Sequence, residues 1–184
     1  IDPTGINPIA RNKVPGAEFF FRTDTGERIK MVAWFGTDGL GRDIYSRVVY
    51  GARVSLLVGV AVALISVVCG LFFGLLAGFF RLLDAVIMRI MDGLMAIPAI
   101  LLAIAMVSLF RSSVWTVIIA ITVPQVPGVV RLVRSIVLSV REEPYVEAAV
   151  TLGTSTPKLL WQHVLPNTIA PMIVQGTFIC ASAI

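Results

Sequence analysis

Charge is what this sequence has least of. Only 14% of its 184 residues are Asp, Glu, Lys or Arg, whereas 57% are hydrophobic. About a quarter of the residues of a soluble domain are charged, so this composition excludes an ordinary soluble domain, and the mean hydropathy of +0.91 agrees. The composition is typical of a membrane protein, and the pattern along the chain has to show how often it crosses the bilayer.

Cysteine, histidine and lysine are also scarce, and this limits the chemistry that the chain can perform. Cys69 and Cys180 lie in apolar runs and are interpreted as small buried side chains. His163 stands alone, without the spacing of a metal site. None of the three lysines follows a glycine-rich phosphate loop, so the sequence has no Walker A site. We therefore expect no metal or cofactor bound by this chain, and no enzyme activity.

Basic residues exceed acidic ones, with a formal net charge of +4 and a pI near 9.5. They are scattered, which is typical of charges that flank membrane spans and argues against nucleic-acid binding. Eight precede residue 54 and four lie between residues 131 and 170. That count alone would place the first 53 residues in the cytoplasm, but the six acidic residues in the same segment leave the orientation undecided.

Four runs without charge predict membrane-spanning helices, because about 20 apolar residues cross a bilayer. The runs cover residues 54–80, 93–110, 114–130 and 168–184. The turn at residues 111–113 is so short that the second and third spans must be antiparallel neighbours. Residues 81–92 carry four charges and are interpreted as a helical connection at the membrane surface. No acid or base lies in the middle of a span, which argues against proton-relay transport.

Small residues recur at four-residue spacing in the first span. They form two sets, Ser55, Gly59 and Ala63, then Ser66, Gly70, Gly74 and Gly78. Such spacing places each set on one helix face, and in a membrane small side chains let helix backbones approach closely. We expect this helix to be buried among other helices.

The first 53 residues are polar and mixed. Within them, residues 19–21 and 29–35 are interpreted as short strands or interfacial patches. Residues 36–47, GTDGLGRDIYSR, are rich in glycine and charge and predict an ordered turn that leads into a helix.

The long polar break at residues 131–163 contains two helix starts. The first is Glu142-Glu143-Pro144, where proline suits the first turn and acids suit the positive end of the helix dipole. The helix would cover residues 145–152, and Gly153 would end it in the left-handed conformation that glycine adopts without strain. The alternative interpretation is an ordinary inter-span loop.

The second helix start is Thr156-Pro157, with Thr156 as the N-cap. Its helix would cover residues 158–164, and Pro166 would stop it. The break therefore predicts a helix, a sharp turn and a second short helix outside the hydrocarbon layer.

The pattern EAA, three residues, Gly and a gap ending in LP resembles the coupling loop of ABC importer permeases. GTDGLGRDIYSRVVYGARVSL and HVLPNTIAP are similar to segments of the dipeptide/oligopeptide/nickel branch of that family. The two motifs lie in the expected order, and the similarity covers roughly residues 34–184. Residues 1–33 match nothing that we can name.

The resemblance implies roles for two sets of residues. In the loop, the residues that shape a docking surface for a cytoplasmic ATPase and fix the exit into the next span are Glu147, Ala148, Ala149, Gly153, Leu165 and Pro166. The motif before the first long span comprises Gly36, Thr37, Asp38, Gly41, Arg42 and Asp43.

The resemblance also implies an all-α, polytopic fold, a type I-like bundle of six spans. We expect this chain to be a fragment with about four of them. Residues 1–53 would form an extracytoplasmic segment, and residues 54–184 a permease domain with its coupling loop at about 131–167. The expected location is the bacterial or archaeal cell (inner) membrane.

The expected partners are two ATPase subunits that bind ATP and Mg, a second permease subunit and an extracytoplasmic substrate-binding protein. Peptides are the expected cargo of the importer. Ser108, Thr122 and Gln125 are the candidates to line its path. The alternative is an ion-coupled transporter or channel, which needs polar or ionisable groups in the middle of the membrane, where the sequence offers little beyond Thr122 and Gln125. A third class, a membrane-embedded enzyme, would have to use the cluster of Asp38, Arg42 and Asp43.

Overall fold

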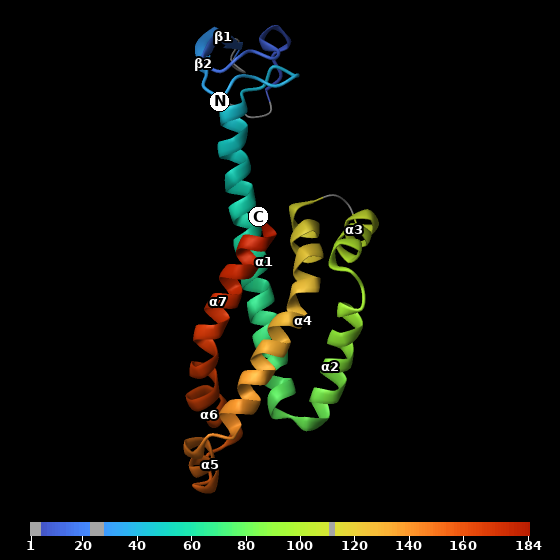
Figure 1. Ribbon diagram of the computed structural model, residues 1–184, viewed down its shortest axis with the longest axis vertical. Helices are drawn as coiled ribbons and strands as arrows, with labels where there is room; N and C mark the ends of the chain where they lie inside the picture. The colour runs from blue at the N-terminus through green and yellow to red at the C-terminus, as the bar shows by residue number, and fades with distance from the viewer. Residues whose placement is uncertain (1–4, 23–27, 111–112) are drawn as a thin grey trace. The chain divides into compact units, whose positions relative to one another are not determined.

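The computed structural model describes residues 5–22, 28–110 and 113–184 (Figure 1). The chain forms two compact units, residues 1–56 and 57–184, and helix α1 (Ile44–Phe79) contributes to both. The expected turn between the second and third spans includes residues 111–112, which lie outside the described residues.

The N-terminal unit contains a two-stranded antiparallel sheet. Strands β1 (Ala17–Arg22) and β2 (Arg28–Ala33) pair with Ala17 opposite Ala33. A 3₁₀ turn, η1 (Pro8–Ala10), precedes them. Ala10, Phe19 and Ala33 are buried together and form the small core of this unit. The two aromatic and apolar patches are therefore strands, as one of the two interpretations of the sequence predicted.

The glycine-rich segment before α1 is an ordered turn built around Asp38. Its carboxylate accepts hydrogen bonds from the backbone N–H groups of Leu40 and Arg42 at 2.9 Å each. It also accepts from the Arg42 Nε at 2.8 Å and from the Arg47 Nη1 at 2.7 Å. Gly41 occupies the left-handed region with φ of 75°, so the turn can close tightly over this carboxylate.

Burial opposes the negative charge of Asp38, but the hydrogen bonds from Arg42 and Leu40 outweigh it and lower its pKa to about 2. The remaining motif residues start the helix. The backbones of Thr37 and Asp43 form a bridge, and the Asp43 carboxylate accepts from the Ser46 N–H at 3.0 Å. The expected turn leading into a helix is confirmed.

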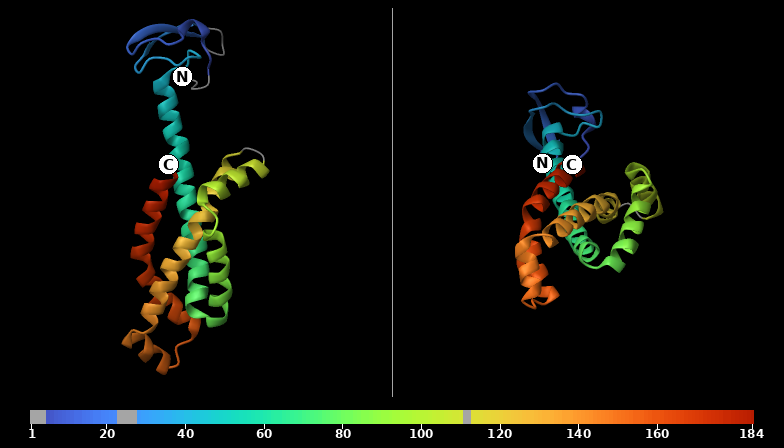
Figure 2. Two further views of the ribbon diagram at one scale, coloured as in Figure 1. Left: turned by 45° about the vertical axis from the view of Figure 1, so that its right-hand side comes forward. Right: turned by 60° about the horizontal axis from the view of Figure 1, so that its bottom comes forward.

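The second unit consists of helices that pack around α4. In chain order they are α1, α2 (Arg81–Met95), α3 (Ala99–Leu109), α4 (Val114–Arg141), α5 (Pro144–Thr151), α6 (Thr156–Leu159), the π turn η2 (Leu160–Val164) and α7 (Leu165–Ala183). Helices α2, α3 and α7 all contact α4 (Figures 1 and 2). In the described residues, three helices are long and apolar enough to span a membrane, and the bent pair α2 and α3 is a fourth candidate. The expectation of about four spans is confirmed.

The second expected span, over residues 93–110, does not form one continuous helix. Helix α2 runs to Met95, and α3 begins at Ala99 at an angle of 86° to it. Pro98 has no N–H to donate, and its ring disfavours helical backbone at Ile97. The helix therefore breaks there, and the charged residues 81–92 belong to a helix that packs on α4 instead of forming a surface connection.

Helix α4 is longer than the sequence suggested. It continues past the expected end at Val130 to Arg141, through Pro124 and Pro127. The reason is the apolar spacing of Val133, Val137 and Val140, which are buried on one face of the helix. The polar break therefore begins at residue 142 and not at residue 131.

The glycines of the second set in α1 pack against α4, whereas Gly59 of the first set lies next to Cys180 of α7. The predicted close packing is confirmed for these glycines, and the structure supplies the partner helices. The positions of these glycines leave no room for a side chain. A Cβ at Gly74 would lie 2.5 Å from the Cβ of Val133, and one at Gly78 would lie 2.6 Å from that of Val137, while a Cβ at Gly70 would collide with Val129. These three Gly–Val pairs advance by four residues on both helices, so α1 and α4 run parallel in register.

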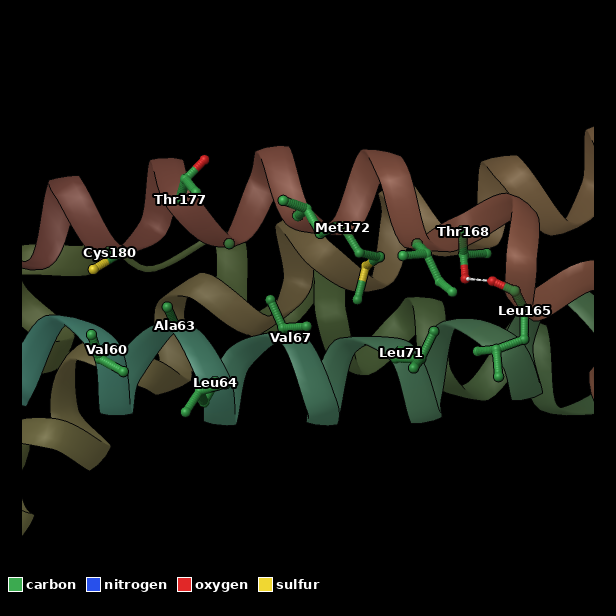
Figure 3. A pocket seen from close by; sticks show the side chains of 13 residues that line it. Val60, Ala63, Leu64, Val67, Leu71, Leu165, Thr168, Met172, Thr177 and Cys180 are labelled. Atoms are coloured by element: carbon green, nitrogen blue, oxygen red, sulfur yellow. Dashed lines mark hydrogen bonds between the residues drawn. The ribbon is translucent and has the colours of Figure 1, made fainter.

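A groove of about 440 Å³ lies between α1 and α7. Figure 3 shows its lining, which includes Val67 and Leu71 from α1 and Met172 from α7. Thr168 keeps its hydroxyl bonded to the carbonyl of Leu165 at 2.7 Å, so the groove presents an almost wholly apolar wall. Cys180 lines the groove as well. Cys69 and Cys180 are both half-buried, and neither forms a disulfide bond.

The close contact between Gly74 and Val133 gives a test that compares two glycines of α1. Alanine substitution at Gly74 and at Gly51 should change the free energy of unfolding differently. Gly74→Ala should lower the free energy of unfolding by about 1–3 kcal/mol, because overpacking forces α1 and α4 apart. Gly51→Ala, where no atom lies within 4 Å, should be neutral or stabilising by up to about 1 kcal/mol because alanine favours helix. Thermal unfolding in detergent measures both, and an equal effect of the two substitutions would contradict the packing.

The low pKa of Asp38 predicts a pH-dependent stability. A carboxylate whose folded pKa is about 2, against 3.8 ordinarily, stabilises the fold above pH 4 and loses that contribution as the pH falls from about 4 to about 2. Asp38→Asn should therefore lower the melting temperature at pH 7 and have little effect at pH 2. A difference between wild type and variant that is the same at both pH values would contradict the hydrogen-bonded arrangement.

Candidate coupling loop

The first helix of the polar break is α5, and its ends follow from its sequence. Glu143 is the N-cap residue and Pro144 occupies the first turn, as predicted. At the other end, the N–H of Gly153 donates to the carbonyl of Val150 at 2.9 Å, and the N–H of Thr154 donates to that of Ala149 at 3.0 Å. This is a Schellman motif, and Gly153 has the φ of 78° that the motif requires.

The second helix differs from the prediction at both ends. Ser155, not Thr156, is the N-cap residue of α6. Pro166 does not stop the helix, which continues through the π turn η2 into α7. The wider π turn, in which the Leu165 N–H donates to the Leu160 carbonyl, gives the ring of Pro166 the space that a regular α-helical turn denies it.

Apolar side chains on the inner face fasten the loop to the helix bundle. Val146, Leu159 and Val164 are almost completely buried in the main core, next to Val140 of α4. Ala149 is half-buried and packs against the same core. Four points of attachment make this loop an ordered extension of the bundle.

A polar contact fixes the angle between α5 and the start of α7. Asn167 donates from Nδ2 to the Tyr145 hydroxyl at 3.1 Å and to the His163 carbonyl at 2.6 Å. The rings of Tyr145 and His163 lie 5.8 Å apart. The imidazole of His163 thus lies beside Tyr145, and no cluster of metal-ligating side chains occurs in the described residues.

The residues predicted for docking do not all face outward. Glu147, Ala148 and Gly153 are exposed, whereas Ala149 faces the core. Leu165 is half-buried and Pro166 exposed, at the entry into α7. Four of the six predicted residues are therefore exposed, and two of these four, Ala148 and Gly153, have almost no side chain.

Sequence reasoning missed two large apolar residues on the outside of the loop. Leu152 is 86% exposed beside Gly153, and Trp161 is 73% exposed on the following helix. Large apolar side chains in a polar segment are the signal that identifies them. On a protein surface, such residues are typical anchors for a partner.

A groove of about 570 Å³ lies between the loop and the ends of α1 and α4, with Phe79 and Arg141 in its lining. Its floor is apolar, with Val146 and Leu159, and its rim carries Glu147 and the hydroxyl groups of three threonines. The threonines are Thr151, Thr154 and Thr156. The groove can accept a side chain that has an apolar stem and a polar end.

Arg141 connects this groove to α1. Its Nη1 donates to the carbonyl of Gly78 at 3.1 Å, and its guanidinium lies 5.4 Å from the centre of the Phe79 ring. The end of α1 and the end of α4 are thus held together directly before the loop begins.

The three residues that were candidates to line a path lie on two helices. Ser108 and Thr122 each donate a hydroxyl hydrogen bond to the carbonyl four residues earlier in their own helix, at 2.8 and 2.7 Å. Gln125 is half-buried in α4. Thr122 and Gln125 lie three residues apart in α4, whereas Ser108 belongs to α3.

The chain was compared with known proteins. Residues 66–184 match the family described as binding-protein-dependent transport system inner membrane component. A probable peptide ABC transporter permease protein of Sinorhizobium fredii is 49% identical over 183 residues, which are 100% of this chain and 58% of the relative. The dipeptide transport system permease protein DppC of Alkalihalophilus pseudofirmus is 46% identical over 82% of this chain and 50% of its own length. The chain spans about half the length of the curated relatives it matches.

Gly153 provides a test of the loop geometry. A side chain in the left-handed region costs about 1–2 kcal/mol, and asparagine tolerates that region better than alanine. Gly153→Ala should therefore lower the free energy of unfolding by about 1 kcal/mol and Gly153→Asn by clearly less, although a Cβ meets no atom there. Thermal unfolding compares the two variants, and an equal loss would argue against the left-handed cap.

Proposed function

Since the chain belongs to the family of binding-protein-dependent transport system inner membrane components, we propose that it is a permease subunit of an ATP-driven importer. It is a multi-pass inner membrane protein, with three apolar helices and one bent pair long enough to span the bilayer. Peptides are the proposed cargo, because the similar proteins of S. fredii and A. pseudofirmus are named peptide and dipeptide permeases.

The observation that carries the proposal is the ordered loop between α4 and α7. Its inner face is fixed in the core by Val146 and Leu159. Its outer face presents Glu147, Ala148 and Gly153 next to the exposed Leu152. A loop that is tightly held on one side and apolar on the other suits the transmission of force from a partner, because a mobile loop would absorb the movement.

The proposed partners are two cytoplasmic ATPase subunits, a second permease subunit and an extracytoplasmic binding protein. ATP and Mg would be bound by the ATPase subunits, because the sequence of this chain contains no glycine-rich phosphate loop. In this arrangement the chain contributes no catalytic group. It contributes the path and the loop on which the ATPases act.

The position of Arg141 supports a route for that action. A push on α5 reaches α4 through Val146 and Val140, and it reaches α1 through the contacts of Arg141 with Gly78 and Phe79. The Gly–Val pairs between α1 and α4 then carry it along both helices. Closure of the ATPases would thus move α1 and α4 as one body.

Co-purification with the cognate ATPase tests the proposal in the complete transporter. Glu147→Lys and Gly153→Asp should reduce the amount of ATPase that co-purifies by about tenfold, since that is the effect of about 1.4 kcal/mol. ATP-dependent peptide uptake in cells should fall in parallel.

Two control variants isolate the docking surface. Glu18→Lys makes the same charge change on β1, where Glu18 forms only an exposed ion pair with Lys30, and should leave co-purification unchanged. Gly153→Asn preserves the left-handed turn without adding charge and should bind the ATPase better than Gly153→Asp. Unchanged co-purification and uptake for Glu147→Lys and Gly153→Asp would contradict the assignment of the loop, and peptide uptake without an ATPase would contradict an ATP-driven importer.

A further inference from the structure

Two ion pairs join α2 to α4, and they differ in the number of their hydrogen bonds and in the exposure of their side chains. Arg134 binds Asp84 with two parallel hydrogen bonds, Nε to Oδ1 at 2.5 Å and Nη2 to Oδ2 at 2.6 Å. Both side chains are largely covered, at 30% and 22% exposed. Arg131 makes one bond to Asp92, Nη2 to Oδ1 at 2.5 Å, and these side chains are 44% and 56% exposed. The first pair is a fixed contact of the bundle, whereas the second is open to exchange with another charged partner.

The register between α1 and α4 shows where these two ion pairs lie along the length of the bundle. Gly70 lies opposite Val129 and Gly78 opposite Val137, so both arginines lie at the height of residues 70–78 of α1. That part of α1 has no charged residue, and it exposes Phe72 and Phe73. At one height, therefore, one side of the bundle is wholly apolar and the other carries four charges.

The outward face of α4 carries one charge and two hydroxyl groups over the same stretch, together with the exposed Leu138. Its exposed positions include Gly128, Arg131, Ser135 and Ser139, which follow the three- and four-residue spacing of one helix face. The inward face of α4 is formed by valines. A helix face of this composition is unsuited to lipid, because a charged group in hydrocarbon costs several kcal/mol and such groups turn to the protein interior or to water.

Open space accompanies the exchangeable pair. A Cβ built at Gly93, next to Asp92, or at Gly128, one turn before Arg131, meets no atom within 4 Å. Both glycines are exposed. Ile87 and Met91 of α2 pack with Val130 of α4 in one buried cluster, so the seam itself is closed. The open space at the two glycines lies on the outer edge of this seam, beside the exposed ion pair.

We propose that the outer edge of the seam between α2 and α4, where Asp92 and Arg131 are exposed, faces the aqueous path and that these two residues form a binding position for zwitterionic cargo. The inference rests on the proposed function as a peptide permease. A peptide carries an ammonium group and a carboxylate at its ends. Arg131 would exchange Asp92 for the carboxylate of the cargo, and Asp92 would accept the ammonium group. The two charges of the protein are then satisfied both with cargo and without it, so neither is left buried and unpaired when the cargo leaves.

The first experiment measures whether the seam is wet, in the complete transporter in proteoliposomes. Single cysteines are introduced at Gly93, Gly128 or Phe72 after replacement of Cys69 and Cys180 by alanine. Only a hydrated thiol ionises and reacts readily with a charged thiosulfonate, so Gly93→Cys and Gly128→Cys should react at least about tenfold faster than Phe72→Cys. Phe72 is the matched control, since it lies at the same height and is 58% exposed.

The second experiment tests cargo recognition on the same two cysteines. With binding protein and a non-hydrolysable ATP analogue present, alanyl-alanine should slow the labelling of Gly128→Cys several-fold. N-acetyl-alanyl-alanine amide, which has neither charge, should not slow it. Added Asp92→Asn or Arg131→Gln should abolish the protection, whereas Arg89→Gln, an exposed residue of α2 for which the described structure records no ion pair, should preserve it.

The outcomes separate this inference from the proposed function. Labelling of Gly93→Cys and Gly128→Cys as slow as that of Phe72→Cys would overturn the aqueous seam. Equal protection by both peptides, or protection that survives Arg131→Gln, would overturn recognition of charged ends. ATP-dependent uptake of alanyl-alanine by the wild-type transporter is measured separately. Its absence together with fast labelling would refute the peptide importer while supporting the wet seam.

Discussion

The close approach of α1 and α4 is the contact on which the rest of the structure depends. Three glycines of α1 receive three valines of α4, and none of these glycines has space for another carbon atom. In a membrane, where lipid is as apolar as a leucine side chain, this fit of shape is what holds helices together. Because the pairs keep one register, the two helices end at the same height. Arg141 can then bind the last turn of α1, and the loop begins from a fixed point.

The loop and the α2–α4 seam use this fixed body in different ways. The loop is attached by apolar side chains that exclude water, and its outer face is left for a partner. The seam is attached by ion pairs, one tightly covered and one half-exposed. Packing of small and β-branched residues suits a part that must stay rigid, whereas an exposed ion pair can exchange its partners at little cost. The closed contact with α1 and the exposed ion pair with α2 thus lie on different faces of α4.

The features that the sequence could predict are those set by local chemistry. The spacing of Gly70, Gly74 and Gly78 predicted the buried face of α1, and Glu143, Pro144 and Gly153 predicted the limits of α5 because caps depend on single residues. The long-range features were not accessible in this way. The continuation of α4 to Arg141 depends on a partner for its valines, and the pairing of Asp92 with Arg131 joins residues that are far apart in the chain. The prediction that Pro166 ends the second helix of the loop was wrong, because a π turn accommodates a proline that would end an ordinary helix. Ala149 was placed with the docking residues, since the motif does not record which face of α5 is buried.

Site-specific photo-crosslinking tests the central claim, that the outer face of the ordered loop is where the ATPase acts. A benzophenone amino acid at Leu152, which is 86% exposed, should crosslink to the ATPase subunit in the assembled transporter. The same group at Leu138, on α4 outside the loop and 37% exposed, should not. Crosslinks that form from Leu138 and not from Leu152 would contradict the account.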